Sequence, residues 1–131
     1  MIRMKKEKFH IEYLLDKVSV NNLWPRLATS FGLSEWFAEN VMEDGNRFTF
    51  YWDNHPAEAE LIGTNPMVYV RFRWLEEDPS TFFEFRLHKV EVTGSQILEI
   101  TDFAEKDEKD AAITLWNTQI KVLKRKLGLL A

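Results

Sequence analysis

The chain has 131 residues, of which 45% are hydrophobic and 14% aromatic, so it can form one domain around one core. Its net charge of −4 argues against nucleic acid or an anionic membrane surface as the main partner. Because the chain has no cysteine, disulfides, thiolate metal sites and cysteine nucleophiles are excluded.

The N-terminal residues run directly into a pattern typical of a β-strand. Residues 1–8 are largely charged and lack the apolar core of a signal peptide, and no later stretch is long enough to span a bilayer. We therefore expect a cytoplasmic protein that does not insert into membranes. Alternating apolar residues predict a first strand over about residues 8 to 15.

Two short helices are expected after this strand. Pro25 is tolerable only in the first turn of a helix, which places the start of the first helix near Asn21. Gly32 is expected to end that helix, and a second helix is expected from about Leu33 to Ala38.

From Asn40 onward the hydrophobic period is two, which predicts antiparallel strands joined by turns. Asp44-Gly45-Asn46 is a strong hairpin signal, and further turns or loops are expected at 54–56, 63–66 and 76–80. Val90 and Val92 have the opposite parity to the preceding strand, which indicates a bulge near residues 88–89. The strands are predicted at about 40–43, 47–53, 57–61, 68–74, 83–87 and 96–103.

A long amphipathic helix is predicted over residues 107 to 127. Asp107 and Asp110 resemble a capping pair at its start, and Gly128 is expected to end it. Basic residues between 121 and 126 suit the negative end of the helix dipole. Its apolar stripe is formed by Ala112, Ile113, Trp116, Ile120, Leu123 and Leu127, and is widened by Leu115 and Val122.

The charged residues of the central strands fall on the faces that point outward. They can form a carboxylate pair or an arginine clamp, but the interpretation that we favour is a solvated ladder of cross-strand pairs. We identify no catalytic residue, metal site or cofactor, and the three histidines do not have the spacing of a metal motif. Because all candidate ionisable residues are predicted to face outward, an enzyme of the cyclase or hydrolase kind is the least favoured function. The charged positions are Glu58, Glu60, Arg71, Arg73, Glu84 and Arg86.

The inward aromatic residues converge between the predicted sheet and the last helix. They either pack solidly or leave a cavity, and the small residues Ala57 and Ala59 on the same face fit both arrangements. Gln119 needs a hydrogen-bond partner if it is buried, which a ligand or trapped water can supply, but it can also reach solvent. The candidate ligand-cavity residues are Phe50, Trp52, Phe72, Trp74, Phe83, Phe85, Trp116 and Gln119.

The segment from Asn22 to Ala38 has a short helix with an aromatic residue, then threonine and serine, then Gly-Leu and Trp-Phe. With the strands at 70–74 and 83–87, this order resembles the START-like or SRPBCC superfamily, also called helix-grip or Bet v 1-like. Within it, the chain is most similar to the branch related to the C-terminal domain of heat-shock chaperone ATPase activators (AHSA-type).

The resemblance implies a single START-like α+β domain over residues 1–131. Its fold would be a curved antiparallel sheet of about seven strands, with two short helices after the first strand and a long C-terminal helix packed on the sheet. The implied function is binding of a hydrophobic small molecule, a lipid or an aromatic compound. The alternative is a protein–protein module, chaperone-associated or homodimeric, whose contact would involve Leu115 and Val122, or Tyr51 or Tyr69.

Overall fold

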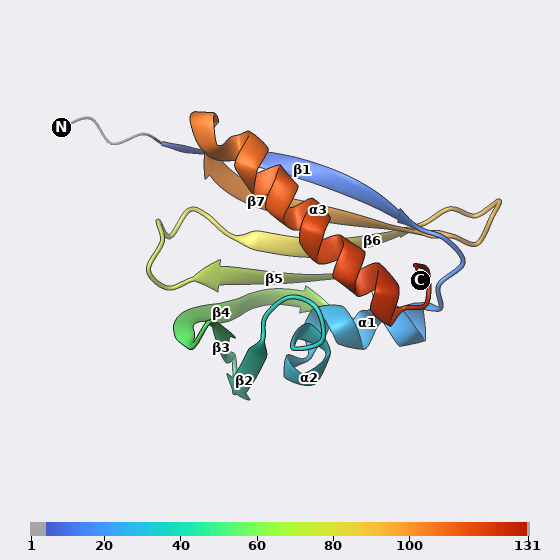
Figure 1. Cartoon of the computed structure of the whole chain (residues 1–131), viewed down its shortest axis with the longest axis horizontal. Helices are drawn as coiled ribbons and strands as arrows, with labels where there is room; N and C mark the ends of the chain where they lie inside the picture. The colour runs from blue at the N-terminus through green and yellow to red at the C-terminus, as the bar shows by residue number, and fades with distance from the viewer. Residues whose placement is uncertain (1–4, 131) are drawn as a thin grey trace.

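The computed structural model describes residues 5–130 and contains one seven-stranded antiparallel sheet with a long helix across one face (Figure 1). The strands lie in the order β1-β7-β6-β5-β4-β3-β2, and both short helices follow β1. This confirms the predicted helix-grip α+β fold. In chain order, the elements are β1 (Lys6–Leu15), α1 (Val20–Ala28), α2 (Ser30–Leu33), β2 (Asn40–Asp44), β3 (Arg47–Trp52), β4 (His55–Asn65), β5 (Tyr69–Trp74), β6 (Phe83–Lys89), β7 (Gln96–Glu105), the 3-10 turn η1 (Lys106–Glu108) and α3 (Lys109–Lys126).

Residues 1–4 and 131 lie outside the described part of the chain, and with them half of the segment considered above as a signal peptide. Within residues 5–130, no helix combines the length and the apolarity that a membrane crossing needs.

The sheet changes partner and register along β4, its longest strand. The first half of β4 pairs with β3, and the second half pairs with β5 as far as Asn65, with an irregularity between Leu61 and Gly63. A bulge of this kind bends a strand and increases its twist. The turn predicted at 63–66 is therefore wrong, because most of that segment continues the strand to Asn65 past the bulge.

The connection between β3 and β4 is tighter than the predicted turn at 54–56. Asp53 and Asn54 both have left-handed backbone angles, with φ of 49° and 64°. They form a two-residue turn of the type that fits the twist of a hairpin. His55 and Pro56 consequently already belong to β4, paired with β3. The other predicted hairpin is confirmed, since Asp44 pairs with Arg47 across Gly45 and Asn46.

The parity change at Val90 marks the end of a strand rather than the predicted bulge. β6 ends at Lys89, and the chain reverses through hydrogen bonds from Val90 N to Ser95 O and from Gly94 N to Val90 O, both 2.8 Å. Val92 lies in this reversal and is 96% exposed.

Helix α1 begins one residue before the predicted start, and Pro25 lies in its second turn. The hydroxyl of Ser19 caps the helix by accepting from Asn21 N at 3.2 Å. The expectation that Pro25 must occupy the first turn is wrong. The proline costs one hydrogen bond, the one that its missing N–H would donate to the carbonyl of Asn21.

Gly32 does not end α1 but lies inside α2, packed against the backbone of α1. A Cβ added to Gly32 would be 2.0 Å from the carbonyl oxygen of Pro25, so no larger residue fits there. Thr29 ends α1 instead, with its N–H and hydroxyl both donating to Pro25 O. The predicted helix at 33–38 is also wrong, because α2 is Ser30–Leu33 and residues 34–37 form a turn.

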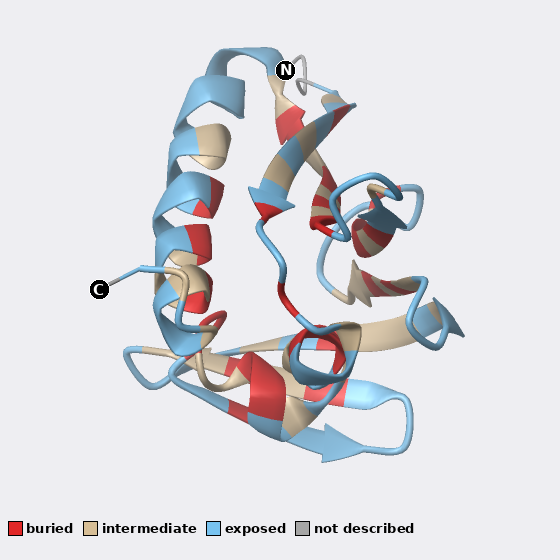
Figure 2. Ribbon diagram, turned by 90° about the vertical axis from the view of Figure 1, so that its right-hand side faces the viewer, coloured by how far each residue is buried: buried red, intermediate tan, exposed pale blue. Residues whose placement is uncertain are grey.

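Helix α3 packs its apolar face on the concave side of the sheet (Figure 2). Trp116, Ile120 and Leu123 are the buried residues of its stripe. The predicted capping pair of Asp107 and Asp110 does not form, because η1 precedes α3 and the residue at its N-cap makes no side-chain capping bond. The predicted C-terminus is confirmed: Gly128 has φ of 80°, a backbone conformation that favours glycine.

Candidate functional site

A cavity of about 180 Å³ lies between the N-terminal half of α3 and the end of the sheet where β3 and β5 finish and β6 begins. Five of the eight candidate cavity residues line it: Trp52, Trp74, Phe83, Trp116 and Gln119. The other three, Phe50, Phe72 and Phe85, are 0% exposed and form the packed core beside it. The remaining lining residues are Phe37, Asp102, Ala112 and Leu115.

Phe37, the second residue of the Trp-Phe pair in the family-like segment, fills much of the space between α3 and the sheet, although it was not among the candidate cavity residues. Its ring stacks on Trp116 and Phe83, with centroids at 5.6 and 5.5 Å, and meets Phe50 and Trp52 edge-on at 5.2 and 5.4 Å. Interiors of this kind are close-packed. The interior is therefore mostly solid, and the cavity is its small unfilled end.

The carbonyl of Phe37 also orients two lining side chains. It accepts a hydrogen bond from Trp52 Nε1 at 2.9 Å and another from Gln119 Nε2 at 3.1 Å. The side chain of Gln119 thus has a protein partner for its N–H₂ group. Within residues 5–130 its Oε1 has no hydrogen-bond donor, which leaves one acceptor at the cavity wall.

Asp102 is the one acid among the described lining residues, and it was not among the candidate residues predicted from the sequence. Asp102 lies on the same face of β7 as Leu98 and Ile100, both 0% exposed. The alternation of β7 therefore contained the signal that Asp102 points inward. The expectation that all ionisable residues face outward is wrong for this residue.

The carboxyl group of Asp102 is held by two donors from the protein. Trp116 Nε1 donates to Oδ2 and the backbone N–H of Phe103 donates to Oδ1, each at 2.8 Å. Burial raises the pKa of Asp102, although both hydrogen bonds and the charge of Lys6 act in the opposite direction. The cavity therefore has an acid that is costly to keep charged.

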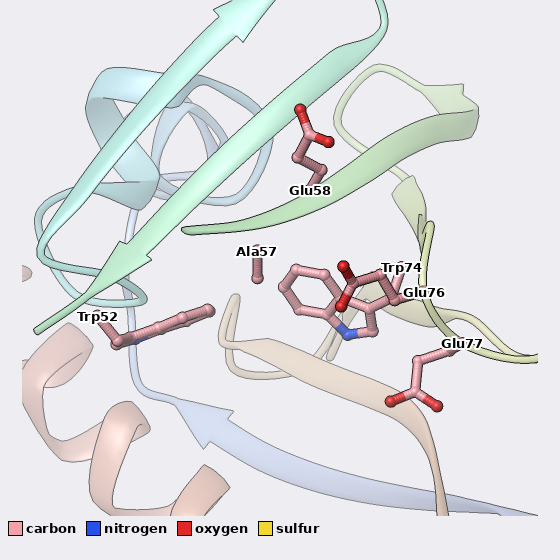
Figure 3. A pocket seen from close by; sticks show the side chains of 6 residues that line it. All are labelled: Trp52, Ala57, Glu58, Trp74, Glu76 and Glu77. Atoms are coloured by element: carbon pink, nitrogen blue, oxygen red, sulfur yellow. The ribbon is translucent and has the colours of Figure 1, made fainter. Parts of the chain in front are cut away.

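On the far side of Trp52 and Trp74, an adjoining hollow of about 230 Å³ opens at the end of the sheet. The two indoles point toward one another near Ala57, and Glu76 and Glu77 lie on the side of Trp74 (Figure 3). Glu58 also lines the hollow, but its carboxylate points away from the indoles and lies 3.8 Å from Arg47. The two tryptophans thus separate the cavity beneath α3 from an outer, acidic hollow.

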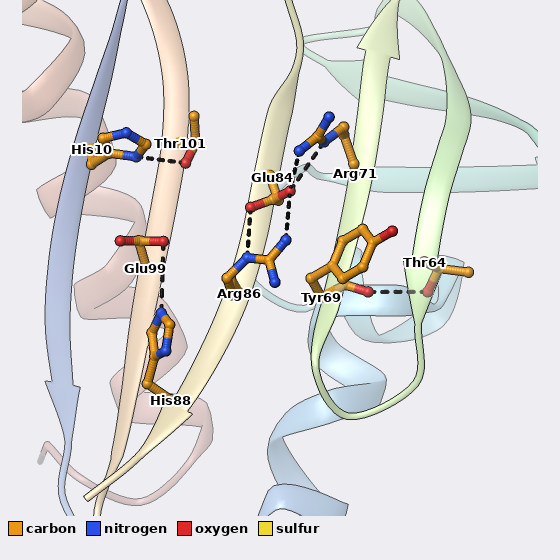
Figure 4. Close-up of polar contacts among 9 residues, drawn as sticks. All are labelled: His10, Thr64, Tyr69, Arg71, Glu84, Arg86, His88, Glu99 and Thr101. Atoms are coloured by element: carbon orange, nitrogen blue, oxygen red, sulfur yellow. Dashed lines mark hydrogen bonds and ion pairs between the residues drawn. The ribbon is translucent and has the colours of Figure 1, made fainter.

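The face of the sheet away from α3 carries the predicted cross-strand charges (Figure 4). Arg71 pairs with Glu84 at 2.8 Å and Arg73 with Glu60 at 3.4 Å, in the register of their strands. Glu84 is only 4% exposed, so the interpretation of the whole row as solvated is wrong at this residue.

Burial alone would raise the pKa of Glu84, but the hydrogen bonds and charges of Arg86 and Arg71 outweigh it and hold the pKa below its usual value. Arg86 also lies over the ring of Tyr69, and Arg71 over the ring of Phe82, at 4.5 and 4.0 Å. The ion pairs of Glu84 with Arg71 and Arg86, together with the aromatic contacts of the two arginines, connect β5 to β6 through their side chains.

The histidines do not come together. His10 contacts the hydroxyl of Thr101 at 2.8 Å, and His88 lies 3.7 Å from Glu99 (Figure 4). Among residues 5–130, no three His, Asp or Glu side chains are grouped so that they could hold a metal ion.

Chemically, the cavity offers aromatic walls and two hydrogen-bond acceptors, Asp102 and Gln119. An apolar cavity of about 150 Å³ accommodates benzene in another protein. At about 180 Å³, this cavity is large enough for a single ring with a short substituent. Among the described lining residues there is no serine, histidine or lysine to act as a nucleophile.

Comparisons with known proteins agree with this architecture. The family model of the START-like superfamily domain matches residues 3–129. The solution structure of BfR322 from Bacteroides fragilis is 40% identical, with a TM-score of 0.68 over 94% of this chain and 92% of that one. None of the curated proteins compared with the chain matches it significantly.

Two more distant structures share the fold. The Aha1 dimer from Colwellia psychrerythraea is 19% identical, with a TM-score of 0.77 over 92% of this chain and 96% of that one. Protein MLL2253 from Mesorhizobium loti is 17% identical, with a TM-score of 0.71 over 91% and 95% of the two chains.

Proposed function

The chain belongs to the START-like superfamily, and we propose that it binds a small, ring-containing apolar molecule in the cavity between α3 and the sheet. The observation that carries this proposal is a cavity of about 180 Å³ walled by Phe37, Trp52, Trp74, Phe83 and Trp116. Pockets for drug-sized ligands are typically about 300–1,000 Å³. The proposed ligand is accordingly a single-ring compound or a short acyl chain rather than a large lipid.

The packing around the cavity supports a preformed site. Phe50, Phe72 and Phe85 lie behind its wall and are fully buried, so the rings that face the ligand have little freedom to move. Trp52 and Trp116 are each fixed by a hydrogen bond from the indole N–H. A wall that is already ordered loses little conformational entropy when a ligand binds.

Calorimetric titration and thermal melting with toluene, benzyl alcohol and hexanamide test this function. For ligands of about eight non-hydrogen atoms we expect dissociation constants on the order of 0.1–1 mM. Ala112→Phe fills the cavity and is expected to abolish binding, because Ala112 lines it. The matched control is Ala111→Phe, one residue earlier on the exposed side of α3.

Saturable binding that is lost only in Ala112→Phe supports the proposal. Absence of saturable binding for all three compounds, or equal binding by the two variants, contradicts it.

A second candidate, a protein–protein module, is favoured by one observation. Leu115 lines the cavity and is 60% exposed, so an apolar side chain stands at the surface beside the proposed site. If this surface mediates self-association, the sedimentation coefficient rises with protein concentration and Leu115→Glu prevents the increase. A monomer at all concentrations counts against self-association.

A further inference from the structure

The acid in the cavity wall narrows the chemistry of the ligand. We propose that the bound molecule is a small arylalkylamine whose protonated amine pairs with Asp102. This inference rests on the proposed function. The two hydrogen bonds that Asp102 accepts use one position on each oxygen. An ionised carboxylate has about four such positions, so each oxygen can accept one further bond.

Among the described residues, no lysine, arginine or histidine forms an ion pair with Asp102. The charged groups that act on it are Lys6 of β1, which favours the carboxylate, and Glu77, which opposes it. Lys6 Nζ is engaged by Glu77 Oε2 at 2.8 Å. Asp102 is half-buried, and a carboxylate with reduced access to water is costly unless it is paired, so a ligand cation fills the place of the missing partner.

The remainder of the wall also suits an ammonium group. The Nε2 of Gln119 donates to the carbonyl of Phe37, which assigns the opposite end of the amide as the oxygen and leaves Oε1 as a free acceptor. An ammonium has three N–H donors, so it can use Asp102 and Gln119 together. The rings of Trp52, Trp74 and Trp116 line the same space, and aromatic rings attract cations at their faces.

The outer hollow, like the cavity, carries negative charge. Glu58, Glu76 and Glu77 line the hollow on the other side of Trp52 and Trp74 (Figure 3). Glu77 is paired with Lys6 and Glu58 lies 3.8 Å from Arg47, so these acids exceed their paired cations by one negative charge, that of Glu76. Carboxylates around an entrance raise the local concentration of cations and repel anions. The outer hollow thus favours the approach of an amine over that of a carboxylic acid.

Three probes of nearly equal size, benzylamine, benzyl alcohol and toluene, separate the charge from the ring. We expect wild-type protein at pH 7.5 and low salt to bind benzylamine at least about tenfold more tightly than the other two. Asp102→Asn is expected to weaken benzylamine about tenfold and to change benzyl alcohol by less than about threefold. Folding of the variant is checked by circular dichroism and melting, and the comparison on wild-type protein does not depend on it.

The outcomes distinguish the two proposals. A preference for benzylamine that is lost in Asp102→Asn supports the amine ligand. If toluene or benzyl alcohol binds as tightly as benzylamine, or if Asp102→Asn keeps the preference, the amine assignment is overturned while ring binding stands. If none of the three probes binds, the proposed function fails, and the amine assignment fails with it.

Discussion

The indole N–H of Trp116 on α3 donates to the carboxylate of Asp102 on β7 at 2.8 Å. This bond joins the helix to the sheet at the cavity wall and fixes the orientation of both side chains. It also makes an acid, rather than a purely apolar surface, part of the space that a ligand would occupy. The ionisation of Asp102 and the packing beside it therefore give rise to measurable effects.

Asp102 should contribute more to the stability of the folded protein in acid than at neutral pH. Because its folded pKa is raised, its contribution is fully present below the unfolded value of about 3.9 and is lost as the pH rises through the folded pKa. Lys6 and Glu77 act on this pKa in opposite directions. The free energy of unfolding of the Asp102→Asn variant, relative to wild type, should increase between about pH 3 and pH 7.

Urea unfolding at several pH values measures this difference. Its change with pH is informative even if the asparagine lowers stability everywhere, since one amide end would face a backbone or indole donor. A difference that stays constant across the range would show that Asp102 titrates as it does in the unfolded chain.

Glu84 should show the opposite pH dependence. Its folded pKa is lowered, so its contribution is present above the unfolded pKa and is lost as the pH falls through the folded value. Glu84→Gln is expected to lower the free energy of unfolding by about 1–3 kcal/mol at pH 7, since it removes bonds to two arginines. The loss should shrink in acid.

The matched control is Glu60→Gln, which breaks the more exposed pair with Arg73. That change should cost no more than about 1 kcal/mol at any pH. Equal losses in the two variants would mean that the buried position of Glu84 has no energetic consequence.

Gly32→Ala should disrupt the contact between α1 and α2. The added Cβ would lie 2.0 Å from Pro25 O, against backbone that cannot move without displacing α1. We expect a loss of about 3 kcal/mol or more in urea unfolding. Gly94→Ala is the control, because its φ of 74° is unfavourable for alanine but nothing lies within 4 Å of the new Cβ; it should cost about 1–2 kcal/mol. Similar losses would contradict the importance of the close approach.

Phe37→Ala should enlarge the cavity and lower stability together. Removing a buried ring that contacts Trp116, Phe83 and Phe50 is expected to cost about 3–5 kcal/mol. The variant should also bind a two-ring probe such as naphthalene, which the native cavity excludes. Phe82→Ala, on the opposite face of the sheet, should leave naphthalene binding absent. Binding of naphthalene by wild-type protein would show that Phe37 does not limit the cavity.

The faces of the strands could be predicted because alternation depends on the local sequence alone. Phe50 and Phe72 were placed inward from this pattern and are fully buried. The same rule places Asp102 inward with Leu98 and Ile100, in contrast to the expectation that all candidate ionisable residues face outward. Its partner, Trp116, is 14 residues further along the chain, and the pattern of one strand does not reveal such a donor.

The remaining differences arise from contacts between distant segments. The burial of Glu84 depends on two arginines, one on β5 and one on β6, and on their aromatic neighbours Tyr69 and Phe82. Gly32 reads as a helix terminator in the sequence, and only the approach of α2 to Pro25 shows that it is a packing position. The central place of Phe37 likewise depends on where the turn after α2 meets α3, which hydrophobic period does not determine.

The decisive experiment is an NMR measurement of contacts between benzylamine and the protein. We expect intermolecular nuclear Overhauser effects from the benzyl ring to the methyl group of Ala112 and to the indole protons of Trp52 and Trp116. The indole of Trp24 on α1, which does not line the cavity, should show none. Contacts confined to residues outside the cavity, or an indole resonance of Trp116 that stays unchanged at saturating benzylamine, would contradict binding of the amine in this cavity.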